Sequence, residues 1–313
     1  MSAVDESALG RFGRRARHGL RVVTTPALWR EQVRFLRHGP SPTAVPVHDA
    51  RFPPTPWRPL PTGAAAVCNI CTWQGDAFLG DRHVEAQLCP ACGASARDRF
   101  SFLCFIARTP PARRLRVTET SPRLDAAYRR AMQRWFRYTA TDFDESSHRG
   151  TVRVDLQDVS LAPASVDVLL SAHVLEHVPD TERALAGIRR TLAPGGRLYL
   201  QVPVQNGVTA PPSTPELHED RTPVFWRFGF DLADRLRAHG LTTTVLVTAP
   251  MADAIAGGDA APLDGRGSGW DVPAMVAAAR GIGAQSVLDR AAAERLGLWH
   301  SYQFVVFEAV VPR

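Results

Sequence analysis

The segment from Val166 to Val204 constrains the fold of this chain more than any other. It begins with an apolar run, Val166–Leu170, that leads through a polar elbow into a stretch with apolar residues at helical spacing. Asp180 can cap this helix, and the Pro-Gly-Gly turn at 194–196 ends it before a second apolar run, Arg197–Val202. The segment therefore predicts one βαβ unit, which implies a parallel sheet with a right-handed crossover.

The exact residues of this unit are more specific than its apolar spacing. The elbow reads HVLEH, with His173, Glu176 and His177, and LAPGGRLYL follows the helix. Together they closely resemble the fourth and fifth strands of class I S-adenosylmethionine (SAM) dependent methyltransferases. The resemblance implies an α/β fold with a Rossmann-like, seven-stranded sheet whose last strand is antiparallel. It also implies SAM as the cofactor and methyl transfer as the activity.

The resemblance also assigns the first strand of the sheet. Its best match runs from Leu115 into the loop that ends at Pro122, where Glu119 and Ser121 are the candidate cofactor contacts. Class I enzymes place an acidic, glycine-rich loop here, which lets the backbone approach the cofactor. This loop contains no glycine, so it resembles a branch of the family with a proline-containing turn. A SAM-fold protein that has lost catalysis is the alternative.

Two aspartates follow the next two strands. The second strand, Phe136–Thr141, ends at Asp142, where the family places the carboxylate that holds the ribose hydroxyls. The third strand, Thr151–Val154, leads into Asp155, where the family places an acceptor for the adenine amino group. A carboxylate at the C-terminal end of such a strand faces the crevice in which open α/β sheets bind ligands. The alternative for Asp142 is a turn former within TDFDESS.

Two histidines are the candidate catalytic residues. His173 and His177 follow the fourth strand, where the family presents the methyl group, and histidine suits a general base near neutral pH. His173 is also a candidate cofactor contact. Two alternatives stay open: the reaction can rely on proximity and orientation with no strong base, or His177 can order the loop by hydrogen bonding.

Four cysteines form a second motif. Two Cys-x2-Cys pairs are separated by 17 residues, and the four members are Cys68, Cys71, Cys89 and Cys92. This spacing is typical of a zinc ribbon, in which four thiolates close a tetrahedral structural Zn²⁺ site that has no open position for catalysis. Disulfides are the alternative, which a chain without a secretion signal does not favour. Cys104 lies in an apolar run and is predicted to be a buried small hydrophobe.

A ribbon followed by a SAM-type domain resembles two groups of enzymes. One comprises bacterial methyltransferases with a four-cysteine knuckle pair, a CPxCG segment and the HVLEH motif. CPACGASARDRF matches that segment, and the likeness covers roughly residues 66–245. The other comprises ribosomal-RNA guanine methyltransferases with an N-terminal zinc module, which should retain the glycine-rich loop. The departure in the loop therefore favours the first group. We predict methyl transfer to a small-molecule or metabolite acceptor, with an RNA methyltransferase as the alternative.

The positive charge of the chain is concentrated near its N-terminus. Residues 1–60 hold ten arginines against four acidic residues, and this excess of six equals the formal net charge of the whole chain. Thr25-Pro26 predicts the start of a helix that ends at Gly39-Pro40, before a proline-rich stretch. We interpret this arm as a docked helix with a linker and expect no nucleic-acid partner. An RNA clamp and a membrane-surface contact are the alternatives.

The organisation predicted from these motifs has three parts. Residues 1–62 are a basic arm and linker, 63–104 a zinc ribbon and 105–313 a SAM-dependent methyltransferase domain. Its last two strands are Thr242–Val247 and Tyr302–Val310, and residues 251–298 between them form an insertion with a loop and one helix, a lid or filler. No apolar run approaches the roughly 20 residues that span a bilayer, and the N-terminus lacks a signal core, so we predict a cytoplasmic protein.

The loop after the fifth strand is the predicted substrate-facing loop. It carries an acidic pair, Glu219-Asp220, ahead of Phe228-Gly229, and the bacterial group has a similar acidic pair before an FG segment. A helix is predicted from Trp226 onwards. Functional residues concentrate on loops at this edge of a sheet, which is why we expect this loop to contact the acceptor.

Overall fold

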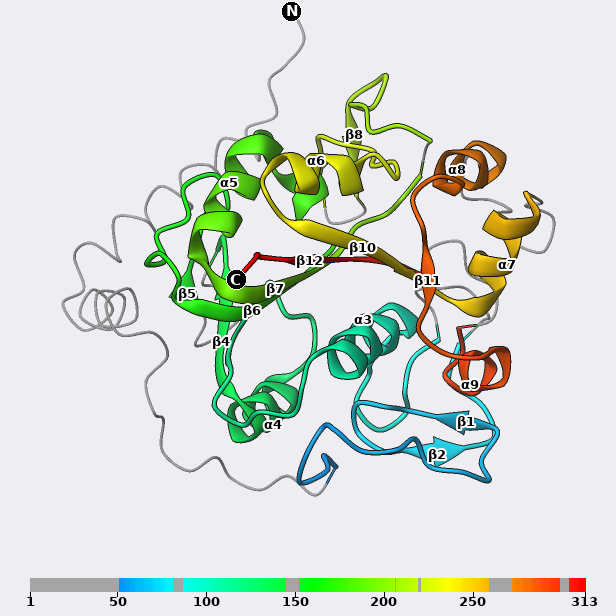
Figure 1. Ribbon diagram of the computed structural model, residues 1–313. Helices are drawn as coiled ribbons and strands as arrows, with labels where there is room; N and C mark the ends of the chain where they lie inside the picture. Colours follow the sequence, from blue (N-terminus) through cyan, green and yellow to red (C-terminus); the bar gives the residue numbers. More distant parts are fainter. Residues whose placement is uncertain are drawn as a thin grey trace, which may run out of the picture.

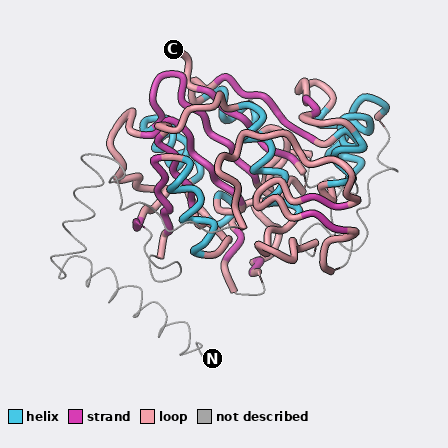
Figure 2. The backbone as a smooth tube through the Cα atoms, turned by 90° about the horizontal axis from the view of Figure 1, so that it is seen from below, coloured by secondary structure: helices cyan, strands magenta, loops and turns pink. Residues whose placement is uncertain are grey.

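The computed structural model of the chain describes residues 51–80, 87–144, 152–205, 207–218, 221–258, 272–298 and 304–313. The helix predicted in the N-terminal arm and the acidic pair Glu219-Asp220 lie outside these ranges. The described residues form a central sheet with helices on both faces (Figure 1). Figure 2 shows the same body from below, with the strands running through it.

Across the sheet the strands lie in an order that differs from their order along the chain. In that order its strands are β11 (Gln285–Ser286), β10 (Thr242–Val247), β12 (Val305–Val310), β7 (Leu192–Gln201), β6 (Val166–Ala172), β3 (Arg116–Thr120), β4 (Arg137–Asp142) and β5 (Val152–Arg153). Strand β12 runs antiparallel to both of its neighbours, and the other pairs are parallel. The α/β class, the seven predicted strands and the antiparallel last strand are confirmed.

Two details of the sheet differ from the prediction. Strand β11 adds an eighth strand beside β10, because Gln285 and Ser286 pair with the end of β10. Strand β7 begins at Leu192, five residues before the predicted start, and includes the Pro-Gly-Gly turn. Its register with β6 shifts between Val166 and Val168, and Gly195 lies in the left-handed region at φ +74°. A glycine tolerates this conformation, so the chain continues through a bulge instead of a separate turn.

Helices cover both faces of the sheet (Figure 1). Helices α5 (Thr181–Thr191), α6 (Leu232–Ala238), α7 (Ala249–Gly257) and α8 (Val272–Ala279) contribute side chains to one core, while α3 (Ala96–Arg108), α4 (Ala126–Trp135) and α9 (Arg290–Arg295) contribute to the other. The predicted cap of α5 is confirmed, since the Asp180 carboxylate accepts from the backbone N–H of Arg183 at 2.9 Å. Asp125 caps α4 in the same way.

The insertion at 251–298 contains more regular structure than one helix. Its described part holds most of α7, all of α8 and α9, and strand β11. Met251, Ile255 and Met275 are buried in the core of one sheet face, whereas the Arg295 guanidinium donates to the carbonyls of Pro61 and Ala64 beside the ribbon. The alanine-rich sequence gave weak periodicity, because alanine marks neither face of a helix strongly.

The cysteine segment forms a small ribbon that shares its core with the sheet. Strands β1 (Ala66–Val67) and β2 (Gln74–Gly75) pair antiparallel, and the four cysteines and Ile70 pack in one buried cluster with α3 and Tyr199 of β7. Two further elements border the elbow after β6: the 3-10 helix η1 (Leu175–His177) and the hairpin of β8 (Glu216–Leu217) and β9 (Pro223–Val224). None of the helices described is both long and apolar enough to cross a bilayer.

Candidate functional site

The four predicted zinc ligands lie together in the ribbon. The sulfur atoms of Cys68, Cys71, Cys89 and Cys92 are all within 4.8 Å of one another and all four residues are buried. Two of the separations are 3.8 Å, between Cys68 and Cys92, and 3.6 Å, between Cys71 and Cys89. A disulfide needs about 2.05 Å, so these thiols are not bridged. Sulfurs at about 2.3 Å from a tetrahedral Zn²⁺ stand about 3.8 Å apart, which this cluster fits.

Each cysteine pair is held by the same backbone turn. The N–H groups of Thr72 and Gly93 donate to the carbonyls of Cys68 and Cys89 at 3.0 and 2.9 Å. Both turn residues lie in the left-handed region, at φ +72°. Glycine adopts this conformation without strain, whereas threonine does not, so the first turn is the more strained of the two.

The ribbon leads directly into helix α3. Ser95 follows the second cysteine pair by three residues and forms a capping box with Asp98: the Asp98 carboxylate accepts from the Ser95 N–H and hydroxyl at 2.8 Å each. Arg99 is fully buried, stacks on the Phe78 ring of the ribbon and donates to the carbonyl of Leu296 at 2.9 Å. The start of α3 is therefore fixed by the ribbon on one side and the segment after α9 on the other.

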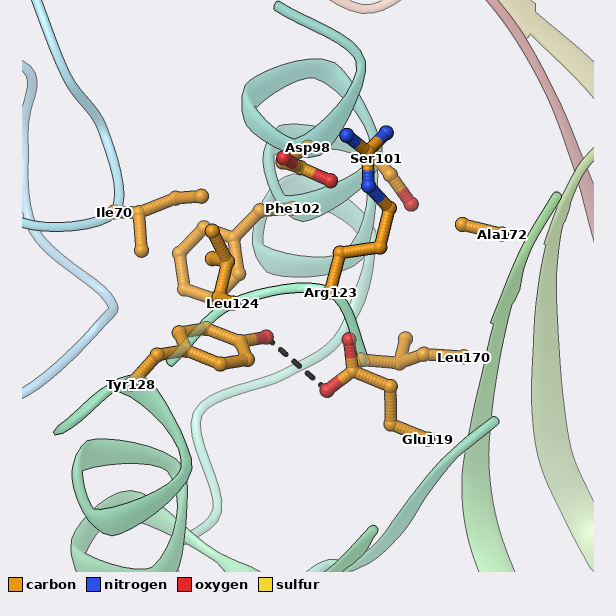
Figure 3. Close-up of a pocket in the computed structure, with 10 residues that line it drawn as sticks. All are labelled: Ile70, Asp98, Ser101, Phe102, Glu119, Arg123, Leu124, Tyr128, Leu170 and Ala172. Carbon is orange, nitrogen blue, oxygen red and sulfur yellow. Dashed lines mark hydrogen bonds between the residues drawn. The ribbon is translucent and has the colours of Figure 1, made fainter. Parts of the chain in front are cut away.

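A pocket opens at the carboxyl ends of β3 and β6 (Figure 3). Helix α3 and the loop after β3 form its other walls. The lining residues are Ile70, Asp98, Ser101, Phe102, Glu119, Arg123, Leu124, Tyr128, Leu170 and Ala172. Of the predicted cofactor contacts, Glu119 lines this pocket.

Glu119 carries an unusual carboxyl group. The hydroxyls of Tyr128 and Tyr138 both donate to its Oε2, at 3.2 and 2.7 Å. Burial raises the pKa of Glu119 to about 7, and the nearby Asp98 carboxylate acts in the same direction, while the two tyrosine hydrogen bonds oppose the rise. The carboxyl is therefore close to half ionised at neutral pH, so a cation bound beside it would favour its ionised form.

Charged groups of both signs meet at the mouth of the pocket. The Arg123 guanidinium lies beside the Asp98 carboxylate and Ser101 (Figure 3). The Asp98 carboxylate uses one oxygen in the capping box, which leaves the other for a further donor. Arg123 has no hydrogen bond or ion pair with any residue in the described ranges. This end of the pocket can thus bind a group that carries both a carboxylate and an ammonium.

Three other predicted cofactor residues lie at this edge of the sheet but do not line the pocket. The Ser121 hydroxyl donates to the Asp142 carboxylate at 2.9 Å, and the Ser121 backbone, at φ +46°, donates to the Thr141 carbonyl at 2.7 Å. Asp142 ends β4 and is 8% exposed. Asp155 lies just beyond β5, where its carboxylate accepts from the Gln157 N–H at 2.8 Å. The two aspartates follow adjacent parallel strands, at the same edge of the sheet as the pocket.

His173 and His177 occupy different surroundings. His173 is in the left-handed region at φ +55°, its side chain is 13% exposed, and its Nδ1 lies 2.9 Å from an Arg97 nitrogen. Burial and the positive charges of Arg97 and Arg123 hold the pKa of His173 well below its usual range. His177 Nδ1 contacts the carbonyl of Pro223 in the β8–β9 hairpin at 2.7 Å. This hydrogen bond favours the loop-ordering role for His177.

Sequence reasoning missed three residues around the pocket. Asp98 and Arg97 lie within the CPACGASARDRF segment, and Arg123 follows Pro122 directly, but their reach into the site depends on how α3 crosses the sheet. The absence of glycine from the loop after β3 was the sequence signal that could have pointed to these side chains. Where the backbone has no glycine to approach a ligand closely, side chains are the remaining source of contacts.

A family model and several solved structures match parts of the chain. Residues 123–200 match the family described as "Methyltransferase domain", and no curated protein sequence matches the chain. Among solved structures, a SAM-dependent methyltransferase from Mesorhizobium loti is 17% identical with a TM-score of 0.36, over 46% of this chain and 82% of that one.

Two further solved structures are similar to parts of the chain. The 1,6-didemethyltoxoflavin-N1-methyltransferase of Burkholderia thailandensis, with bound S-adenosylhomocysteine, is 23% identical with a TM-score of 0.35, over 47% of this chain and 68% of that one. Phosphoethanolamine N-methyltransferase 2 of Haemonchus contortus, bound to SAM, is 15% identical with a TM-score of 0.38, over 67% of this chain and 52% of that one. These likenesses do not bear on the acceptor of this chain.

Proposed function

We propose that this chain, a SAM-dependent methyltransferase by its matched domain and strand order, methylates a small-molecule acceptor and uses its ribbon to hold a structural Zn²⁺. The observation that carries the proposal is the position of the pocket. It lies between β3 and β6, where the strand order of the sheet reverses. Open α/β sheets bind their ligands at such a switch point, outside the carboxyl ends of the strands.

The charged end of the pocket supports a specific orientation for the cofactor. SAM supplies a sulfonium methyl group and ends in a zwitterionic amino acid. We assign its carboxylate to Arg123 and its ammonium to Asp98 and Glu119, which matches a cation with two carboxyl groups and an anion with a guanidinium. These side chains would replace the backbone contacts that a glycine-rich loop makes.

The neighbouring residues suit the other end of the cofactor. We assign the ribose hydroxyls to Asp142, with Ser121 orienting the carboxylate through its 2.9 Å hydrogen bond. Asp155, beyond the next strand, is assigned to the adenine amino group. With the cofactor held along the edge of the sheet in this way, the methyl group would face the elbow that carries His173 and His177.

The distribution of charge supports a small acceptor over RNA. The excess positive charge lies within residues 1–60, and residues 61–313 have as many arginines as acidic residues. A polyanion would therefore find little attraction along the body toward the pocket. The ribbon adds no open metal position, since all four thiolates are taken up by one tetrahedral ion, so Zn²⁺ would act on stability and not on chemistry.

Calorimetric titration of the full chain with SAM tests the cofactor site. We expect binding in the wild type and a loss of about 1–2 kcal/mol in Asp142→Ala, because charge-assisted hydrogen bonds to the ribose are removed. Asp158→Asn is the matched control, since Asp158 lies on the same edge with an exposed side chain. Equal affinity in wild type and Asp142→Ala would reject the assignment, and no binding in the wild type would favour the non-catalytic alternative.

A salt titration separates the acceptor classes. We expect RNA to bind the full chain weakly and to dissociate at moderate salt, because its contacts would come from the basic arm alone. Salt-resistant, sequence-selective RNA binding would favour the RNA methyltransferase alternative.

A further inference from the structure

Arg97 of helix α3 is within hydrogen-bonding distance of His173, which follows strand β6. We propose that Arg97 is a positioning residue that holds His173 as the Nε2–H tautomer, which makes this histidine a hydrogen-bond donor in the site and removes it as the general base. The two residues are 76 positions apart in the sequence and meet at the carboxyl edge of the sheet.

The hydrogen-bonding capacity of arginine fixes the direction of this contact. A guanidinium has donors only and stays protonated, so the His173 Nδ1 at 2.9 Å must present its lone pair. The proton of a neutral imidazole then resides on Nε2. One competing partner exists: Glu176 Oε1 lies 3.4 Å from the same Nδ1. A hydrogen bond at 2.9 Å is close to the optimum for N–H donors, whereas 3.4 Å is not, so the Arg97 contact decides the tautomer.

The charges around the ring oppose its protonation. Arg97 reaches it from α3 and Arg123 from the loop after β3, His177 belongs to η1, and His218 follows β8; each of these lowers the pKa of His173. Glu176, also in η1, is the acidic group near the ring. Burial acts in the same direction as the basic groups. An imidazolium would also place a second N–H against the guanidinium, so the neutral ring is the form that fits.

The backbone of His173 is also fixed by its surroundings. Its backbone N–H donates to the Gln201 carbonyl of β7 at 2.8 Å, and its left-handed φ of +55° is uncommon for histidine. Such a conformation persists where the surroundings over-determine it, often at functional sites. The Nε2 atom is buried and has no hydrogen-bond partner among the described residues. A donor is therefore fixed in place with its acceptor still to be supplied.

The consequence for the reaction rests on the proposed function. If His173 donates through Nε2, it can hold a lone pair of the acceptor molecule but cannot take a proton from it. With His173 excluded as the base, we expect an acceptor that arrives with an unprotonated nucleophile, such as a carboxylate, a phenolate or a neutral nitrogen.

Nitrogen NMR of the ring tests the tautomer on the full, zinc-loaded chain without cofactor or acceptor. The His173 signals are identified by their loss in His173→Gln. We expect a pyridine-like Nδ1 and a pyrrole-like Nε2 that do not change between pH 5.5 and 8. A protonated Nδ1, or a ring that titrates within this range, would overturn the proposal.

Two substitutions at Arg97 separate positioning from mere support of the fold. In Arg97→Met we expect the tautomer preference to be lost, with Nδ1 protonated in a large fraction of molecules. Arg97→Lys keeps a charged donor and should restore the pyridine-like Nδ1. An unchanged His173 spectrum in a folded Arg97→Met protein would refute the role of Arg97. If that variant does not fold, the wild-type spectrum and Arg97→Lys still decide. Failure of SAM binding would leave these spectra unaffected, so the two proposals fail separately.

Discussion

Replacement of Glu119 by glutamine should change how the stability of the fold depends on pH. Glutamine has nearly the shape of glutamic acid, and its carbonyl oxygen can still accept from the hydroxyls of Tyr128 and Tyr138. It does not titrate. Glu119→Gln therefore removes the ionisation of this carboxyl while keeping its hydrogen bonds and its volume in the wall of the pocket.

The size of the effect follows from the pKa of Glu119. Burial raises this pKa from an ordinary value of 4.5 to about 7, so the folded state binds the proton more tightly than the unfolded state does. The stabilisation is fully present below about pH 4.5 and is lost as the pH rises through 7. At about 1.4 kcal/mol per pH unit, the full effect is about 3 kcal/mol. Because water can enter the pocket and solvate the ionised form, we expect about 2 kcal/mol between pH 5 and pH 8.

Urea unfolding of the zinc-loaded proteins at several pH values measures this difference. We expect the wild type to lose about 2 kcal/mol relative to Glu119→Gln between pH 5 and pH 8. Glu294→Gln, an exposed carboxyl on α9, is the control and should follow the wild type. Parallel curves for wild type and Glu119→Gln would refute the reasoning, as would a wild type that gains stability relative to the variant as the pH rises.

Three further predictions concern the ribbon and the core. Purified, reduced protein should contain one zinc ion per chain by metal analysis, and Cys89→Ser should lose the metal and unfold at a lower temperature, because binding and folding of such sites are coupled. Thr72 and Gly93 both have φ +72°, a conformation that strains a residue with a Cβ. Thr72→Gly should therefore raise the free energy of unfolding in urea by about 0.5–1 kcal/mol, and Gly93→Ala should lower it by about 1 kcal/mol. The loss in Gly93→Ala would come from the backbone alone, because a Cβ at Gly93 meets no neighbour. Glu308→Gln should cost about 3 kcal/mol in the same assay, because it removes the buried charge that Arg108 and Arg197 pair with; a cost below about 1 kcal/mol would contradict this.

The sequence predicted the parts of the fold that have local periodic signals. Strands β6 and β7 with the intervening helix were evident from apolar spacing, the Asp180 cap and the glycine turn, and β10 was predicted to the residue. The cysteine pairs predicted their own cluster, because each knuckle is a local turn and only the meeting of two knuckles is long-range. In each case the signal lay within a short stretch of consecutive residues.

The parts that were wrong or missed depend on contacts between distant segments. Helices α7 to α9 contain many alanines, so no apolar stripe in the sequence marks their buried faces. Their burial depends on the segments they pack against, which are β11 for α7, α7 for α8 and β1 of the ribbon for α9. The pairing of Arg97 with His173 and the approach of Asp98 to Arg123 depend on the angle at which α3 crosses the sheet. The run Arg97-Asp98-Arg99 is evident in the sequence. Which of these residues faces the ribbon and which faces the pocket is determined by the tertiary structure.

Helix α3 explains why a ribbon and a pocket of this kind occur together. Successive residues of its first turn serve different neighbours: Arg97 contacts His173, Asp98 lines the pocket, and Arg99 stacks on Phe78 of the ribbon. The first turn of a helix frays readily unless it is capped and packed. Here the cap residue, Ser95, lies three residues after the second cysteine pair, so the cluster that fixes the cysteines also fixes the cap. In the function proposed above, these side chains would supply the ligand contacts that a glycine-rich loop makes through its backbone, and the ribbon holds them at the edge of the sheet.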